Sequence, residues 1–371
     1  MKIAYFIVWY DGPHSGVGKK VQDQIAAWKT LGHDAKIFIL TSKSHHSGWT
    51  SCMDVDTVLV ETNKLDKYLC RRKILANVKN WDPDILYMRE AFPIGSIKKF
   101  CSKTTTVLEI NSDASRELRN RSLIKYVVNF TYRRHYYFGI HACVFVSNEL
   151  KDSSPSFMKR KPNLVVGNGI DFSRVPWLSP VGTSDRIKLI FIGTQEHYWG
   201  GIEQIFELAK LRPHFVIHVI GIDADNTFDN LPNVIFHGKL EQEKYHKIAS
   251  ECTAGLSTLS LGKKGMREAS PLKSREYLAL GLPIITRYRD TDFHNSEDFI
   301  LTLPLDSLSV AEEIHAIDVF LEKWRGRRVN RDEISQISIL EKEFFKLDFF
   351  EELRKSFGKS RVNGDKLSDW S

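Results

Sequence analysis

The stretch EASPLKSREYLALGLPIIT, from Glu268 to Thr286, holds the pattern on which the fold assignment depends. Two glutamates, Glu268 and Glu276, stand eight positions apart on either side of SPLK. Proline is favoured in the first turn of a helix and serine just before it, so we expect a helix to begin at Pro271 with Ser270 as its N-cap. The closing Gly-Leu-Pro before an apolar run is typical of a helix followed by a buried strand.

The start of this helix is expected to bind an anion. The first amides of a helix have no partner within it, and the helix dipole adds partial positive charge there. These amides belong to Leu272, Lys273 and their neighbours, with Glu268 just before the helix and Glu276 about one and a half turns inside it. This arrangement suits a nucleoside diphosphate sugar, because the amides can bind its phosphates and the carboxylate on each side can bind sugar hydroxyls.

Short apolar runs alternate with amphipathic segments along both halves of the chain. This alternation predicts two domains, each with a parallel sheet covered by helices on both faces. Ligands of such sheets bind at the carboxyl ends of the strands, and the cleft between two such domains is the default active site. Strands are expected at 2–10, 34–40, 55–61, 84–90, 104–110 and 142–147, and then at 186–194, 215–222, 233–238, 254–259 and 281–286, with helices over 16–33 and 200–212.

Length and composition support this division. A chain of 371 residues exceeds one ordinary core, and Gly, Asn and Pro cluster in VVGNGIDFSRVP near its middle. We expect an acceptor-binding domain over 1–165, a donor-binding domain over 166–340, and a last segment, 341–371, with a helix that packs back on the first domain and a polar tail. The five cysteines are scattered and form no C-x-x-C, which favours a reducing compartment.

Charge is distributed unevenly between the two parts. Residues 1–165 carry a net charge of +11 and the remainder −4, which together give the total of +7. A basic half predicts an anionic partner, either nucleic acid or an anionic membrane. No nucleic-acid-binding motif occurs, so nucleic acid is not expected as a partner. The sequence has no run of 18 uncharged apolar residues, so no membrane-spanning helix is predicted.

The glycine-rich loop DGPHSGVGKK, residues 11–20, follows the first strand. A P-loop requires Gly five positions before Gly18 and Ser or Thr after Lys19, but this chain has Pro13 and Lys20 there. Proline offers no amide to a phosphate. The loop is therefore either a plain strand-to-helix turn or another kind of phosphate contact.

Several motifs, in order along the chain, resemble one family. The segment SPLKSREYLALGLPII with its two glutamates resembles the E-x7-E signature of the retaining GT-B glycosyltransferases of glycosyltransferase family 4. Further landmarks follow the family's order over about residues 1–350: SGVGKK, LGHDAKIF, GNGID, FIGT and NVIFHGKLEQEKY.

The resemblance implies an α/β protein of the GT-B fold, with two Rossmann-like, doubly wound domains facing across a cleft. It implies retaining transfer of a sugar from a UDP- or GDP-sugar to a hydroxyl of a glycan or lipid-linked glycan, in surface polysaccharide or glycoconjugate synthesis. No cofactor and no metal are implied, because the helix start and basic side chains bind the diphosphate. The protein would be cytoplasmic, either free or peripheral on the inner face of the cytoplasmic membrane.

The resemblance also implies roles for particular residues. Glu276 would bind the ribose hydroxyls, and Glu268 would contact the transferred sugar, with Lys273 and Arg267 beside it in catalysis. The other donor-binding residues would hold or approach the diphosphate: Ser270, Pro271, Leu272, Lys273, Gly193 and Thr194, with Gly16, Val17 and Gly18 of the glycine loop.

The chain departs from the family at two cations that neutralise the leaving diphosphate. Thr194 stands where the family has Arg, and Gly200-Gly201 stands where it has Lys-Gly. Their loss leaves three alternatives open: replacement by other cations, a non-catalytic GT-B binding or scaffold subunit, or a GT-B sugar-nucleotide epimerase. The candidate replacements are Lys263, Lys264, Arg267 and Lys273.

On the acceptor side, polar residues follow two strands of the first domain. Arg89 and Glu90 end one strand, and Glu109 and Asn111 end the next, so they are expected at the rim of the cleft. The basic and aromatic segment 116–140 is either an amphipathic helix on an anionic membrane, with Arg133 and Arg134 facing the lipid, or a core helix with a solvated face.

No metal site is predicted. Three Asp-x-Asp triplets, at 54–56, 82–84 and 223–225, lie outside the E-x7-E segment and are interpreted as turns or strand starts. Carboxylate pairs do bind Mg²⁺ and Mn²⁺, but the triplet is common by chance in a chain with 46 acidic residues. The thirteen histidines also lack metal-ligand spacing.

Overall fold

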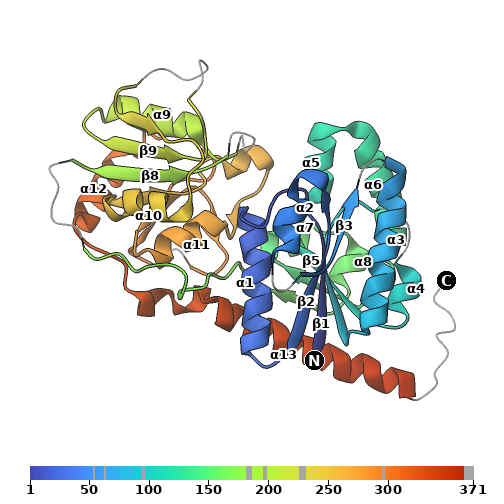
Figure 1. Ribbon diagram of the computed structural model, residues 1–371. Helices are drawn as coiled ribbons and strands as arrows, with labels where there is room; N and C mark the ends of the chain where they lie inside the picture. The colour runs from blue at the N-terminus through green and yellow to red at the C-terminus, as the bar shows by residue number, and fades with distance from the viewer. Residues whose placement is uncertain are drawn as a thin grey trace. The chain divides into compact units, whose positions relative to one another are not determined.

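The chain forms two compact units in the computed structural model, which describes residues 1–52, 55–61, 64–93, 97–180, 186–194, 199–224, 231–294 and 297–362. The first unit is Met1–Val166 together with the segment from Ile339 on, and the second is Gly167–Ser338. Each unit has its own parallel sheet (Figure 1). Each unit also has its own hydrophobic core. The predicted polar tail lies outside the described residues after residue 362.

The first unit is built on a seven-stranded sheet in the order β3-β2-β1-β4-β5-β6-β7. All neighbouring strands are parallel, and the order reverses between β1 and β4, the switch point at which doubly wound sheets bind ligands. The strands are β1 Lys2–Val8, β2 Asp34–Ser42, β3 Val55–Glu61, β4 Ile85–Arg89, β5 Thr105–Ile110, β6 Ala142–Phe145 and β7 Asn163–Val165.

The helices of this unit include the last helix of the chain. Trp28 on α1 stacks edge-on against Tyr87 of β4 at 5.6 Å, and Phe350 of α13 lies 5.4 Å from Tyr87, so α13 completes this aromatic core. The helices are α1 Gly16–Thr30, α2 His46–Thr50, α3 Lys64–Trp81, α4 Lys98–Cys101, α5 Ala114–Arg121, α6 Leu123–Tyr136, α7 Asn148–Ser153, α8 Ser156–Lys159 and α13 Ile339–Val362, with the short 3-10 helix η1 Lys43–His45.

The second unit repeats the plan with a six-stranded parallel sheet, β10-β9-β8-β11-β13-β15, and a separate two-stranded sheet, β12-β14. Its strands are β8 Lys188–Ile192, β9 Val216–Ile220, β10 Val234–Phe236, β11 Ala254–Leu256, β12 Glu268–Ala269, β13 Ile284–Thr286, β14 Arg289–Asp290 and β15 Ile300–Thr302. Its helices are α9 Ile202–Leu211, α10 Gln242–Ser250, α11 Leu272–Ala279 and α12 Ile314–Trp324, with η2 Leu261–Lys264 and η3 Arg331–Ile337.

Each predicted strand range coincides with one observed strand, and only β2 extends beyond its range, by two residues. Long runs of β-branched and aromatic residues mark buried parallel strands strongly. Four strands were not predicted: β7, β12, β14 and β15. Each is only two or three residues long, too short to show a periodicity. The predicted mixed α/β architecture with two parallel-sheet domains is confirmed.

Candidate functional site

The two glutamates of the E-x7-E segment lie on separate elements of the second unit. Glu268 is in β12, and Glu276 is in the second turn of α11. This helix begins at Leu272, one residue later than predicted, and Pro271 occupies its N-cap position without a side-chain hydrogen bond. The predicted N-cap role of Ser270 is wrong, because its hydroxyl bonds to other groups.

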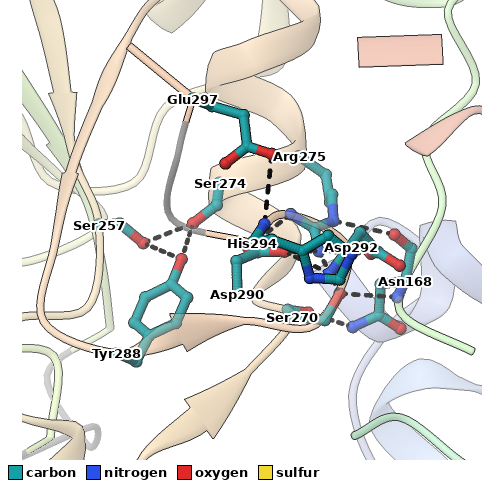
Figure 2. A network of polar contacts seen from close by, with 10 residues as sticks. All are labelled: Asn168, Ser257, Ser270, Ser274, Arg275, Tyr288, Asp290, Asp292, His294 and Glu297. Carbon is teal, nitrogen blue, oxygen red and sulfur yellow. Dashed lines mark hydrogen bonds and ion pairs between the residues drawn. The ribbon is translucent and has the colours of Figure 1, made fainter. Parts of the chain in front are cut away.

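Arg275 is fully buried beside the start of α11 (Figure 2). Its guanidinium donates to both carboxylate oxygens of Asp290, at 2.8 and 2.7 Å, and to Asp292 at 2.7 Å. It also donates to the Ser270 hydroxyl at 2.8 Å and to the carbonyl of Asn168 at 3.0 Å. The amide of Asn168 donates to the same hydroxyl at 2.7 Å. The network therefore joins the loop at the start of the second unit to the residues just before α11.

The charges of this network hold Arg275 in its ionised form. Burial by itself would lower the pKa of Arg275, but the carboxylates of Asp290 and Asp292 outweigh it and raise that pKa above its ordinary value. Sequence reasoning missed Arg275, and it also missed that Asp290 and Asp292 form a fourth Asp-x-Asp triplet. The Asp290–Asp292 triplet was the sequence signal that could have revealed this network, and its carboxylates bind the guanidinium of Arg275.

A second polar cluster supports the same helix from the sheet side. The hydroxyls of Ser257, Ser274 and Tyr288 form a buried triangle, with Ser274 and Tyr288 2.6 Å apart and Ser257 and Tyr288 3.0 Å apart (Figure 2). Burial raises the pKa of Tyr288 to about 12, so the phenol keeps its proton. The first turn of α11 is thus attached both to the sheet and to the loop that follows β13.

Glu276 is held by three donors on α10. Its Oε1 accepts hydrogen bonds from the hydroxyl of Tyr245 at 2.5 Å, from His246 Nε2 at 3.0 Å and from Gln242 Nε2 at 3.4 Å. The carboxylate is about four-fifths buried, with 19% of the side chain exposed. Its position is therefore fixed by α10, and sequence reasoning did not identify these three partners.

Lys273 lies in the first turn of α11 with its ammonium 4.0 Å from the centre of the Phe191 ring. In the described part of the chain this ammonium makes no hydrogen bond and no ion pair. Burial lowers the pKa of Lys273 to about 7. Gly193 permits this arrangement, because a Cβ there would stand 2.5 Å from the Phe191 ring. The neighbouring Thr194 is exposed.

The other candidate cations have partners. Arg267 forms an ion pair with Asp306 at 2.6 Å, and Lys263 forms one with Glu203 at 2.9 Å. The Lys264 ammonium stands 4.4 Å from the centre of an indole ring, that of Trp199. Within the described residues, Lys273 differs from these three in making no ion pair with a carboxylate and no contact with an indole.

The glycine loop of the first unit runs into α1. Gly16, Val17 and Gly18 form the first turn of that helix, and the Ser15 side chain caps it by accepting from the amide of Gly18 at 3.2 Å. A Cβ at Gly18 would approach the carbonyl of Pro13 to 2.5 Å, so close packing of the loop requires this glycine. The assignment of the three residues to a diphosphate stays a prediction.

At the carboxyl end of β5, Glu109 lies in a buried polar cluster. Lys20 donates to Glu109 Oε1 at 2.8 Å and to Asn111 Oδ1 at 2.8 Å, while the hydroxyl of Tyr5 donates to Glu109 Oε2 at 2.5 Å. Burial lowers the pKa of Lys20 to about 8. Burial would raise the pKa of Glu109, but Lys20 and Arg89 hold it far below its ordinary value.

Glu90, at the end of β4, forms a buried ion pair with Arg133 of α6 at 2.5 Å. The prediction that Arg133 faces a membrane is therefore wrong, because this side chain points into the first unit and is 7% exposed. A carboxylate 43 residues away in sequence determines this, so no local pattern could show it. The adjacent Arg134 is exposed.

Among the described residues, no group of three or more His, Cys, Asp or Glu side chains could hold a metal ion. Asp84 accepts the amide of Lys2 at 2.8 Å, and Asp82 has a positive φ of 52° in the turn before β4. Asp54 and Asp225, predicted to lie in turns or strand starts, are outside the described residues. The described helices include none long and apolar enough to cross a membrane.

No family model matches the chain, and no curated protein matches its sequence. Solved structures do match it. The apo form of WaaB, a lipopolysaccharide outer core galactosyltransferase, has a TM-score of 0.61 and 14% identity over 95% of this chain and 100% of that chain. An α-glucosyltransferase in complex with UDP and DNA has a TM-score of 0.58 and 16% identity over 95% of this chain and 99% of that chain.

An epimerase shares the same architecture. The UDP-GlcNAc 2-epimerase from Neisseria meningitidis, bound to UDP-GlcNAc, has a TM-score of 0.53 and 13% identity over 95% of this chain and 100% of that chain. At these identities the likeness shows the fold alone. The chain has the GT-B fold, and the predicted fold class is confirmed.

Proposed function

We propose that the chain is a glycosyltransferase that moves a sugar from a UDP- or GDP-sugar to a hydroxyl of a glycan or lipid-linked glycan, with retention and without a metal, in surface polysaccharide or glycoconjugate synthesis. The GT-B fold, shared with two sugar transferases, supports this. The observation that carries the proposal is Lys273, a half-buried cation in the first turn of α11 that makes no ion pair within the described residues. An anionic ligand at this turn would supply the missing charge.

The donor would bind along α11. The amides after Ser270, at Leu272 and Lys273, take the diphosphate, and Glu276 accepts hydrogen bonds from the ribose hydroxyls. Because α10 already holds Glu276 through Oε1, its carboxylate is oriented before a ligand arrives. Glu268, in β12 just before the helix, contacts the transferred sugar.

The reaction breaks the bond between the anomeric carbon and the diphosphate oxygen and forms a bond from that carbon to the acceptor oxygen on the same face. The acceptor proton passes to the departing diphosphate. Negative charge grows on that diphosphate, and Lys273 stabilises it electrostatically. Lys273 thereby replaces the missing family cations, while Lys263 and Arg267 are already engaged by carboxylates.

The helix α6 supports a lipid-linked acceptor, because it buries polar side chains and exposes apolar ones. Asn129 and Arg133 are buried on this helix, where they bond to Ser115 of α5 and to Glu90. Its exposed large apolar side chains have between 42% and 79% of their surface in contact with solvent: Leu123, Ile124, Val127, Val128 and Phe130. Apolar surface of this extent on one helix is unusual for a side that faces water.

We assign this face of α6 to the surface of an anionic membrane. The exposed cations Arg119, Lys125 and Arg134 lie on α5 and α6 with the apolar side chains, and residues 1–165 carry a net charge of +11. Apolar insertion combined with basic residues is the chemistry of peripheral lipid binding. A protein partner or a second copy would lack the dependence on anionic lipid.

Two other functions remain as alternatives. The epimerase fold match favours a sugar-nucleotide epimerase, which would change the sugar without an acceptor. A non-catalytic binding subunit is favoured by the missing Arg and Lys, since Thr194 and Gly200 stand in their places.

A panel of UDP- and GDP-sugars, incubated with a lipid-linked glycan in the presence of excess EDTA, separates these functions. Transfer is expected, with the new linkage retaining the donor's anomeric configuration. Lys273→Met should lower kcat by about 100-fold or more, as removal of one transition-state donor does. Lys263→Met is the matched control, because its ion pair with Glu203 is exposed. An epimer without transfer, or nucleotide binding alone, would replace the proposal with the corresponding alternative.

A further inference from the structure

The first unit holds a second cation that makes no ion pair within the described residues, at the carboxyl end of β4. Three cations and two carboxylates interact beneath this edge of the sheet. Lys20 pairs with Glu109 at 2.8 Å, and Lys346 pairs with Glu343 at 2.6 Å, both nearly fully buried. Arg89 is the remaining cation, close enough that its charge lowers the pKa of Glu109. Among these five groups, Arg89 is therefore the one without an ion pair.

The Arg89 guanidinium makes no hydrogen bond or ion pair within the residues that the structure describes. Its Nη1 is buried and has no partner. The ring of Trp9 stands 5.5 Å from its Cζ and holds it by a cation–π contact, which uses none of its N–H donors. Buried or half-buried charges in proteins are normally paired, because desolvation costs several kcal/mol.

A second donor in the same cluster is also unused. Asn111 accepts from Lys20 through Oδ1, but its Nδ2 is buried without a partner. Arg89 and Glu109 are paired residues of adjacent strands, and Asn111 follows β5 directly. Both unused groups are donors, and they lie at the carboxyl edge of the sheet next to its switch point, where doubly wound sheets bind ligands.

We infer that Arg89 and Asn111 bind an oxyanion of the acceptor, a carboxylate or a phosphate on the glycan, with Lys20 and Glu109 as positioning residues. The identification of the ligand as the acceptor rests on the proposed function. The presence of an anion site does not depend on it. Arginine offers two parallel N–H donors, the geometry that carboxylate and phosphate groups fit. Glu109 keeps Lys20 and Asn111 in place.

Isothermal titration of the full-length protein with D-glucuronate, D-glucose 6-phosphate and neutral D-glucose tests the site. The wild type should bind at least one anion more tightly than glucose. Comparison of the two anions shows whether the site prefers a carboxylate or a phosphate. Arg89→Gln should lower the affinity for that anion by about tenfold or more, because a charged hydrogen bond is lost. Arg89→Lys should recover part of the affinity. Arg160→Gln, an exposed arginine directly after α8 (Ser156–Lys159) in the same unit, is the matched control and should bind as the wild type does.

Two further measurements make the result specific. Anion binding should survive in Lys273→Met, which excludes the donor site as its location. The thermal midpoint of ligand-free Arg89→Gln should fall only slightly, because the change removes the contact with Trp9 but no hydrogen bond or ion pair of the described residues. A clear fall, equal anion affinity in Arg89→Gln and wild type, or no preference of the wild type for an anion would each overturn the inference. UDP and GDP titrations on the same samples report the proposed function separately.

Discussion

The carboxyl ends of the two sheets can be compared through their cations. In the second unit Arg275 bonds to Asp290, Asp292, Ser270 and Asn168. Lys273, two positions earlier on α11, makes no hydrogen bond or ion pair with a described residue. In the first unit the neighbours differ in the same way. Lys20 bonds to two acceptors, and Arg89 bonds to none in the described residues.

The difference separates structural cations from those available to a ligand. A fully bonded cation such as Arg275 neutralises buried acids, so its removal leaves them charged and unpaired. A cation without acceptors, such as Lys273, already bears a desolvation cost in the ligand-free protein. A bound anion removes that cost, so the unpaired cations Lys273 and Arg89 indicate where substrate would bind.

The largest effect that this comparison predicts is on stability. Arg275→Met leaves Asp290 and Asp292 buried without a counter-charge, and breaking a buried pair in this way costs roughly 3–5 kcal/mol. Urea unfolding monitored by circular dichroism should show this loss in the transition of the second unit. Met is of similar length and has no charge, so the change tests the ion pairs rather than the volume.

The control for this prediction is Lys273→Met on the same helix. It removes a cation that makes no hydrogen bond or ion pair within the described residues, so the free energy of unfolding should change little. If Lys273→Met destabilised the protein as much as Arg275→Met does, the division between structural and available cations would be wrong.

The next effect is on the pH dependence of nucleotide binding. The pKa of Lys273 is about 7 in the ligand-free protein, because burial disfavours its charge. A bound diphosphate favours the charged form and raises this pKa, so binding takes up a proton above pH 7. Affinity for UDP or GDP should fall between pH 7 and 9, by at most about tenfold per pH unit.

Calorimetry in two buffers with different ionisation enthalpies measures this proton uptake directly. The range starts at pH 7 because the terminal phosphate, with a pKa of about 6, is then mostly ionised. In Lys273→Met the uptake should disappear and the affinity should vary little over the same range. Undiminished uptake in the variant would assign the titration to another group.

The smallest effect concerns two adjacent arginines on α6, of which Arg133 is paired with Glu90 and Arg134 is exposed. Arg134→Gln should weaken binding to anionic vesicles by about fivefold, since one cation near a membrane contributes about 1 kcal/mol. Ile124→Ser should weaken binding to neutral and anionic vesicles alike. Co-sedimentation measures both.

Lys247→Gln, an exposed cation on α10 of the second unit, is the control for charge alone and should bind vesicles as the wild type does. Equal binding of the wild type to neutral and anionic vesicles, or binding to neither, would contradict the assignment of α6 to an anionic membrane.

Much of the fold could be predicted from the sequence because its signals are local. Runs such as IAYFIV and LIFI are apolar, as strands buried on both faces must be, and each became part of an interior strand. The E-x7-E segment likewise contains its own helix start and both glutamates. Local spacing therefore determined the two parallel units and placed Glu268 just before α11 and Glu276 in its second turn.

Only the tertiary structure decided which charges are paired. Arg133 and Arg134 are indistinguishable in sequence, and the distant Glu90 makes one of them internal. Arg275 lies among acids that a fold must bring together, and Arg89 is recognisable as unpaired only once all its neighbours are placed. The reason is physical: the cost of a buried charge depends on what surrounds it in three dimensions, whereas hydrophobic periodicity can be read along the chain.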